Sequence, residues 1–503
     1  MKHLRRTKIA AALLALLMLL PLLAGCAEGK PGTADTDKTD DAPVSDNTPS
    51  AEAVPETEED PLDPAVLYDG LPADGYGGYD FLMLIRQNAR WIADMAADEL
   101  NGEAINDAIY RRNSMVSEKF DVTIRYEESS NYNYETDAMT SIRAGDDAYD
   151  LVIPHGRASF LYANQMLCLD WNTALPYVSL DSPWWSQDAR NSFSILGKLF
   201  VMNGDISYNS LGSADVMLFN KQLMTDLGLP FPYETVREGA WTYDLWTSQV
   251  QGAAADLNGD GRIEEEHDRL GYVTQKWVGP MEAFATSGLR VLSKDEDDVP
   301  YLSFYNEKTV AVFERYFALI DSDAAYVDTA DVSYSSGFIN VFEEARALFT
   351  DMNMTDVITL RTMEADFGVI PWPKYDEASE YCTNVDAGTN LFLVPITASD
   401  PARTSAILEA LCRISSRLVL PAYYEVTLQS KASRDNESAD MLDIIKSALI
   451  FDLGYYNSDL SGAFNNEFVD FVGSSNRDIT SWYEKNAKAV TKTLEKNIAK
   501  YRD

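Results

Sequence analysis

An alternation of strand and helix patterns near the start of the folded part of the chain most constrains the fold. Residues 79–85 form a mostly apolar run that predicts a buried strand, and residues 121–126 and 149–153 predict two more. Residues 106–120, between the first two strands, carry apolar side chains at helical spacing. Strands separated by helices pair in parallel through right-handed crossovers, so we predict an α/β fold.

Length and charge limit the number of domains and the kinds of partner. The chain has 503 residues, which at roughly 150 residues per domain predicts two or three domains. It carries 41 basic and 80 acidic residues, a net charge of −39. Binding to nucleic-acid phosphates or to an anionic membrane surface requires clustered cations. We therefore expect no nucleic-acid partner and no electrostatic adhesion to a membrane.

The N-terminus has the pattern of an export signal. Four basic residues precede an apolar run at residues 9–24, which is shorter than the roughly 20 residues that span a bilayer. The run ends in Leu-Ala-Gly-Cys at residues 23–26, which resembles a bacterial lipobox. This resemblance implies a signal peptide at residues 1–25 and a lipid on Cys26. The alternative is an uncleaved anchor helix with an incidental cysteine.

The composition changes after the cysteine. Residues 26–73 are rich in Thr, Asp, Pro, Ser and Glu, and aromatic residues are absent until Tyr68. Such a segment buries too little apolar surface to offset the entropy of ordering it. We predict a disordered acidic tether that connects the lipid anchor to the folded body.

Short segments along the remaining chain occur in an informative order. They are, in sequence, NDAIYRRNSMVSEKFDVTI, YDLVIPHGR, PWW, GKLFVMNGDIS, LFNKQLMTDLGL, GAWTYDLW, DLNGDGRIEEEHDRLGY, FEEARALF, IPWPKYDE and YYEVTLQSKASRDNESADMLDII. Together with the lipobox and the tether they resemble the extracellular solute-binding lipoproteins of ABC importers, in the maltose-binding-protein-like group that carries oligosaccharides. The resemblance extends from about Tyr76 to the C-terminus.

This resemblance implies a fold and a function. The fold would be a two-lobed α/β fold of the periplasmic-binding-protein type II, with hinge-connected lobes that close on a ligand. The expected boundaries are residues 74–210 and 348–416 for the first lobe, and residues 211–347 and 417–503 for the second. The expected function is a lipid-anchored, extracytoplasmic bacterial receptor that captures a carbohydrate and delivers it to ABC permease subunits. We expect a monomer that contacts the membrane through its lipid only.

Aromatic and polar side chains supply the candidate ligand site. Sugars are bound by stacking on aromatic faces and by polar groups that satisfy hydroxyls, and the chain has 9 Trp and 27 Tyr. The loop after the strand at residues 149–153 lies where ligands bind in open α/β folds. For each tryptophan, packing in the core is the alternative. The candidate ligand-binding residues are Arg86, Trp91, His155, Arg157, Trp184, Trp185, Asp205, Trp277, Trp372, Tyr423 and Tyr424.

Two other functional classes stay open as alternatives, a secreted glycan-active hydrolase and a surface adhesin. Glycoside hydrolysis needs two carboxylates beside a sugar, and the sequence has many acids. However, it contains no Gly-x-Ser-x-Gly elbow, no His-Glu-x-x-His helix and no phosphate-binding glycine loop. We therefore expect a binding protein and not an enzyme.

The segment at residues 256–267 matches the opening of a calcium loop. Acidic or amide side chains occupy positions 1, 3 and 5, glycine occupies position 6, and isoleucine position 8. His267 stands at position 12, where an EF-hand has glutamate, and related receptors instead use acids at positions 9 and 10. The expected ligands of a structural Ca²⁺ are Asp256, Asn258, Asp260, Arg262 (through its carbonyl), Glu264 and Glu265, with Glu266 and Asp268 as alternatives. An acidic surface turn without metal is the other interpretation.

Overall fold

The computed structural model describes residues 60–130, 136–329, 337–429, 437–464 and 466–502. The predicted signal peptide, the predicted lipidation site at Cys26 and most of the predicted tether lie outside these residues. In the part of the chain that is described, no helix combines the length and the apolar character that a membrane span requires.

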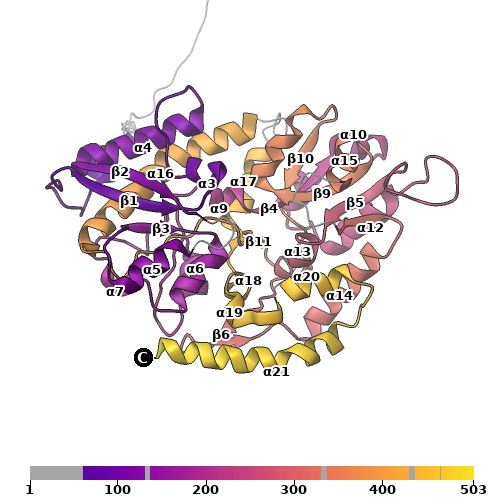
Figure 1. The fold of residues 1–503 in the computed structure, drawn as a ribbon. Helices are drawn as coiled ribbons and strands as arrows, with labels where there is room; N and C mark the ends of the chain where they lie inside the picture. The colour runs from indigo at the N-terminus through magenta and orange to yellow at the C-terminus, as the bar shows by residue number, and fades with distance from the viewer. Residues whose placement is uncertain (1–59, 131–135, 330–336, 430–436, 465, 503) are drawn as a thin grey trace, which may run out of the picture. The chain divides into compact units, whose positions relative to one another are not determined.

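The first sheet is parallel, as the sequence predicts. It contains β1 (Tyr79–Ile85), β2 (Val122–Glu128) and β3 (Leu151–Ile153) in the order β2-β1-β3, and Figure 1 shows these strands beside the helices that connect them. The connections are α4 (Ala104–Phe120) between β1 and β2 and α5 (Asp137–Ala144) between β2 and β3. The carboxyl ends of the three strands therefore share one edge of the sheet.

The second sheet is mixed. Its strand order is β10-β4-β9-β5-β8, with β4 (Asp215–Asn220), β5 (Leu270–Gln275), β8 (Ala325–Asp328), β9 (Ala347–Asn353) and β10 (Phe367–Ile370). Strand β5 pairs in parallel with β8 and β9, whereas β4 is antiparallel to β9 and β10. The start of β4 therefore lies at the same edge as the carboxyl ends of β5, β8 and β9.

The other elements complete the two lobes. The helices are α2 (Pro64–Leu67), α3 (Ala89–Ala93), α6 (Gly156–Ala163), α7 (Trp171–Ala174), α8 (Gln187–Phe193), α9 (Asn209–Gly212), α10 (Lys221–Asp226), α11 (Tyr233–Arg237), α12 (Tyr243–Ala253), α13 (Gly279–Ala285), α14 (Glu307–Ile320), α15 (Gly337–Glu343), η1 (Met354–Thr362), α16 (Pro401–Gln429), α17 (Glu437–Ser447), α18 (Leu453–Tyr456), α19 (Ser458–Ser461), η3 (Gly462–Phe464), α20 (Asn466–Gly473), α21 (Ile479–Ile498) and η4 (Ala499–Tyr501). The short strands are β6 (Leu292–Lys294), β7 (Pro300–Leu302), β11 (Thr383–Asn384) and β12 (Leu449–Ile450).

One predicted lobe boundary differs from the structure. Leu348 was expected to start the return to the first lobe, but it lies in β9, which pairs with β4 and β5 in the second sheet. The chain meets the first lobe later, where Leu393 bridges Val152 and Asn390 bridges His155. An apolar strand fits either sheet equally well, so the sequence pattern alone could not place β9.

The end of the predicted tether is also structured. Within residues 60–73, α2 buries Leu67 completely. The Arg413 guanidinium of α16 donates a hydrogen bond to the carbonyl of Asp69 at 2.7 Å. The prediction of disorder up to residue 73 is therefore wrong for this stretch, because a leucine and a fixed backbone carbonyl anchor it to the core.

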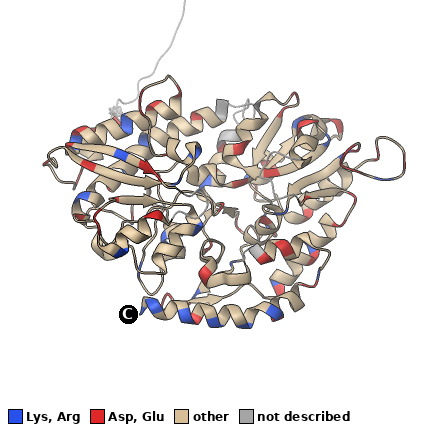
Figure 2. Ribbon diagram, viewed as in Figure 1, with Lys and Arg blue, Asp and Glu red and all other residues tan. Residues whose placement is uncertain are grey.

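The charged residues are distributed over both lobes. Figure 2 shows Asp and Glu around both sheets, together with a run of Lys and Arg positions along α21. The sequence pattern of residues 481–501 predicts a C-terminal helix, which corresponds to α21 and η4. The pattern of residues 438–450 predicts another helix, which corresponds to α17, but its last two residues form β12, which pairs with β11.

A tryptophan cluster fixes α16 to the first lobe. Trp185 is 1% exposed and lies edge-on to Trp171, with ring centroids 5.5 Å apart. Its indole N–H donates to the Glu409 carboxylate at 2.8 Å, and the Trp184 indole donates to the same carboxylate at 3.1 Å. The Arg413 guanidinium donates to it at 2.9 Å. The buried charge of Glu409 is therefore compensated from three sides.

Replacing Trp185 by alanine should destabilise the protein strongly. We expect Trp185→Ala to lower the free energy of unfolding by about 3–5 kcal/mol, the usual cost of removing a fully buried large aromatic side chain. Trp184 is only half-buried, so Trp184→Ala should cost less. Urea denaturation of the two variants measures the difference, and equal losses would contradict the core position of Trp185.

Candidate functional site

Four predicted site residues lie together at the carboxyl edge of the first sheet. Arg86 follows β1 directly, and His155 and Arg157 follow β3 at the start of α6. The Arg86 guanidinium lies 3.8 Å from the ring centroid of Trp91. Burial lowers the pKa of His155 well below its usual value, and the nearby charges of Arg86 and Arg157 lower it further. The imidazole of His155 is therefore neutral in this group.

A segment that connects the second lobe back to the first completes this group. The Arg86 guanidinium donates to the carbonyl of Gly388 at 2.6 Å, and the Gly388 N–H donates to the Asp386 carboxylate at 2.8 Å. The Tyr455 hydroxyl, from α18, donates to the same carboxylate at 3.1 Å. The Arg157 guanidinium lies 5.0 Å from the ring centroid of Tyr455.

We call this group the junction site, and it consists of Arg86, Trp91, His155, Arg157, Asp386 and Tyr455. It combines aromatic rings, guanidinium donors and a carboxylate, which are the groups that bind sugar hydroxyls and ring faces. The site lies where polar loops follow parallel strands, the usual ligand position in open α/β sheets. Asp386 and Tyr455 were not predicted, because no motif marks them and only tertiary contacts bring them here.

A group of acids lies next to the junction site in the second lobe. Asp215 begins β4 and is 2% exposed, and Glu282 in α13 is fully buried. Burial raises the pKa of Glu282 to about 8. Burial, followed by the charge of Glu282, raises the pKa of Asp215 well above its usual value. Burial raises the pKa of the Tyr455 hydroxyl, and the charges of Asp386, Asp215 and Glu282 raise it further.

Two of the predicted tryptophans lie in hydrophobic cores. Trp185 packs in the cluster described above, and Trp372 is fully buried with its ring centroid 5.6 Å from that of Trp246. A buried ring offers no face on which a ligand could stack. The prediction that Trp185 and Trp372 contact the ligand is therefore not kept, since residue type alone cannot separate core from ligand-facing tryptophans.

The remaining predicted residues are dispersed. Trp277 is half-buried beside Lys276, whose ammonium lies 5.0 Å from the indole centroid. Asp205 is joined to Trp184 by a backbone hydrogen bond of 2.8 Å, and burial raises its pKa to about 7. Tyr424 is half-buried, and burial raises the pKa of its hydroxyl; the nearby charges of Asp443 and Asp205 raise this pKa further. None of these residues contacts the junction site through an observed hydrogen bond or ring contact among the described residues.

Tyr423 lines a small apolar cavity instead. Its ring stacks on Tyr208 with centroids 4.9 Å apart, and both rings border a cavity of about 180 Å³. Met354 and Ile358 of η1 also line it. Burial raises the pKa of the Tyr423 hydroxyl to about 12, and the ring borders this cavity and not the junction site.

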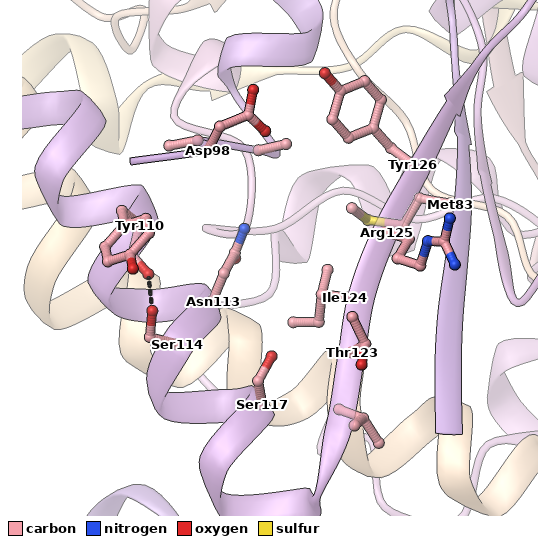
Figure 3. Close-up of a pocket in the computed structure, with 13 residues that line it drawn as sticks. Met83, Asp98, Tyr110, Asn113, Ser114, Ser117, Thr123, Ile124, Arg125 and Tyr126 are labelled. Carbon is pink, nitrogen blue, oxygen red and sulfur yellow. Dashed lines mark hydrogen bonds between the residues drawn. The ribbon is translucent and has the colours of Figure 1, made fainter. Parts of the chain in front are cut away.

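A larger cavity of about 630 Å³ lies in the first lobe between α4 and β2. Figure 3 shows Tyr110, Asn113 and Ser117 of α4 on one side and Ile124 and Tyr126 of β2 on the other. None of the predicted ligand-binding residues lines this cavity. Its walls come from the first lobe alone, so binding there would not couple to closure of two lobes.

The predicted calcium loop is tightly turned. The Asp256 carboxylate accepts the N–H groups of Gly259 and Gly261 at 2.6 and 2.8 Å. Asn258 and Asp260 each accept the N–H of the residue two positions on. These side-chain oxygens are of the type that Ca²⁺ prefers.

The acids at the end of the loop take different positions. The buried Asp268 carboxylate accepts N–H groups of Leu257 and Glu264 at 2.8 and 2.9 Å, which closes the loop on itself. In the described parts of the chain, no group of three or more His, Cys, Asp or Glu side chains is arranged to hold a metal ion. A calcium site here would therefore depend on the Asn258 amide and the Arg262 carbonyl as well as on Asp256 and Asp260.

Comparison with known proteins identifies the fold. No protein-family model and no curated protein matches the chain. Three solved structures of binding proteins do match it, each over 84% of this chain. They are an ABC substrate-binding protein from Listeria monocytogenes in complex with cycloalternan (13% identity, 99% of that chain, TM-score 0.52), a cyclo/maltodextrin-binding protein complexed with maltotetraose (12%, 97%, 0.52) and UgpB from Mycobacterium tuberculosis in complex with glycerophosphocholine (15%, 100%, 0.51).

The chain has the fold of ABC-transporter solute-binding proteins. The predicted two-lobed α/β fold is confirmed. At 12–15% identity the likeness concerns the fold, so the function has to be argued from the chain's own residues.

Proposed function

We propose that this protein is the solute receptor of an ABC importer and that it binds a carbohydrate at the junction site. The observation that carries the proposal is that Arg157, from the carboxyl edge of the first sheet, lies over the ring of Tyr455, whose hydroxyl donates to Asp386. The two solved structures bound to cycloalternan and maltotetraose support a saccharide as the solute class. The glycerophosphocholine-bound structure indicates that the fold also accepts other polar solutes.

The proposed mechanism is a shift of population between conformations. A solute that contacts Arg86 and Arg157 of the first lobe together with Asp386 and Tyr455 makes its full set of contacts only when these groups are close. Its differential affinity for that arrangement drives closure. Permease subunits would then recognise the closed receptor.

A receptor requires no catalytic group, and the residues of the junction site agree with that role. Burial keeps the His155 imidazole neutral, and its Nδ1 accepts the backbone N–H of Arg157 at 3.2 Å. We propose that His155 positions the loop and transfers no proton. Export through residues 1–25 and a lipid on Cys26 complete the proposal, which places the receptor outside the cell membrane.

Removal of Arg157 should abolish solute-induced stabilisation. In a thermal-shift screen against a glycan library, we expect at least one saccharide to raise the melting temperature, since a ligand at a hundred times its Kd stabilises by about 2.7 kcal/mol. Arg157→Ala should lose this shift because it removes a first-lobe contact. Arg125→Ala is the matched control, since Arg125 forms an exposed ion pair with Asp80 away from the site.

Two outcomes would contradict the proposal. One is a screen in which no saccharide changes the melting temperature while another solute class does. The other is release of reducing sugar from a library glycan, lost on Asp386→Asn, which would favour the hydrolase alternative.

We also propose that the loop at residues 256–268 binds a structural Ca²⁺. The ion would be held by Asp256, Asn258, Asp260 and the Arg262 carbonyl, with Glu264 and Glu265 as further oxygen donors. The tight turn supports this proposal because Gly259 and Gly261 take the left-handed backbone, with φ of 79° and 89°. Calcium would stabilise the fold without contacting the solute.

Chelation provides the test of this calcium proposal. We expect EDTA to lower the melting temperature and added Ca²⁺ to restore it, because an ion that binds only the folded state stabilises it. Asp260→Ala should lose this response. Asp244→Ala, an exposed acid on α12, should keep it. A melting temperature that changes neither with the chelator nor with added Ca²⁺ would contradict the proposal.

A further inference from the structure

Asp215 and Glu282 bring two carboxyl groups together in the interior of the second lobe. They are 2% and 0% exposed. The Asn353 amide donates a hydrogen bond to Asp215. Asp351 lies nearby in β9, but its carboxylate already accepts the Tyr272 hydroxyl at 2.6 Å and the Thr274 hydroxyl at 2.8 Å. Glu282, in contrast, accepts no such hydrogen bond among the described residues.

No basic side chain of the described chain forms an ion pair with Asp215, Glu282 or Asp386. Burying a charge is costly unless an opposite charge or hydrogen bonds compensate it. Two like charges side by side raise that cost. The pair therefore requires either a proton or a cation from outside the chain.

Orphaned polar atoms mark the place where such a group would bind. Neither carboxylate oxygen of Glu282 has a hydrogen-bond partner. Asn384, in β11, is 1% exposed, and neither its amide nitrogen nor its amide oxygen has one. Asp215 and Asn384 both lie beside Glu282, since each is close enough to lower the pKa of its carboxyl group. Buried polar atoms without a well-formed hydrogen bond indicate a site for a further hydrogen-bonding group.

The acid pair also lies in the right place for a solute. Asp215 starts β4 and Glu282 follows β5, so both lie at the edge of the second sheet where the parallel strands end. Asp386 influences both carboxyl groups and accepts the Tyr455 hydroxyl of the junction site. A solute held at the junction site would therefore reach the acid pair from the first lobe's side.

We propose that the solute carries a positively charged amino group and that Asp215, Glu282 and Asn384 bind it. This inference rests on the function proposed above and names the chemistry of its ligand as an aminated saccharide. An ammonium group donates three hydrogen bonds, which suits two carboxylates and one amide oxygen. Neutral hydroxyls donate hydrogen bonds but bring no charge to compensate the second carboxylate.

Calorimetry with a matched pair of sugars tests the inference. Glucosamine oligomers carry ammonium groups, whereas their N-acetylated counterparts carry neutral amides at the same positions. We expect the full-length protein to bind the glucosamine oligomer at least tenfold more tightly at pH 7. Glu282→Gln and Asp215→Asn, which each replace one carboxyl group by an amide of the same size, should abolish this preference.

Asp351→Asn is the control for disturbance of the buried acid group, because the Asp351 carboxylate already accepts hydrogen bonds from Tyr272 and Thr274. This variant should still bind the glucosamine oligomer more tightly than its N-acetylated counterpart. The melting temperature of each variant shows whether it is folded. If Glu282→Gln does not fold, the binding preference of Asp215→Asn tests the inference alone. Equal affinity for the two oligomers, or a preference that both variants retain, overturns the inference. Neither result contradicts the proposed function as a carbohydrate receptor. Failure of every saccharide in the glycan library overturns the proposed function as well.

Discussion

The contacts that Arg86 and Arg157 make with the segment around residues 386–388 are the interaction on which the rest of the account depends. Arg86 donates to the Gly388 carbonyl, and Arg157 lies over the ring of Tyr455, which is itself bonded to Asp386. These contacts tie the carboxyl edge of the first sheet to a segment that continues from the second lobe. A solute that joins or replaces them contacts both lobes, and that is the physical basis for coupling binding to closure.

Charge is the feature that distinguishes the junction site and the acids beside it. Two guanidinium groups come from the first lobe, and Asp386, Asp215 and Glu282 lie on the side of the second. Buried charges of this kind reduce stability unless an opposite charge or hydrogen bonds compensate them, and neither carboxylate oxygen of Glu282 accepts a hydrogen bond among the described residues. In contrast, the buried Glu409 is fully compensated by two indoles and Arg413, and its role is structural.

The sequence predicted what depends on local pattern. Strand β1 and helix α4 follow directly from apolar periodicity, and parallel pairing follows from their order. Arg86, His155 and Arg157 could be predicted because they come directly after strands whose carboxyl ends share one edge. What depends on tertiary contact could not be predicted. Asp386 and Glu282 belong to no motif, and their proximity results from how β11 and α13 meet β4.

The errors have physical reasons of the same kind. Trp185 and Trp372 were proposed as ligand residues because indoles bind sugars, yet an indole is equally suited to a core, and both lie there. The resemblance placed Leu348 in the first lobe, and composition could not correct this, because a buried strand is equally apolar in either sheet. Leu67 was assigned to the tether because its neighbours are polar, whereas one leucine was enough to anchor the segment.

Hydrogen exchange of backbone amides, with and without a saccharide that raises the melting temperature, tests the central claim most directly. The account predicts slower exchange in peptides covering residues 155–157, 386–390 and 453–456, because these segments form the junction site from both lobes. Peptides covering residues 256–268 should be unchanged. Protection confined to residues 110–126, around the first-lobe cavity, would contradict a solute site between the lobes.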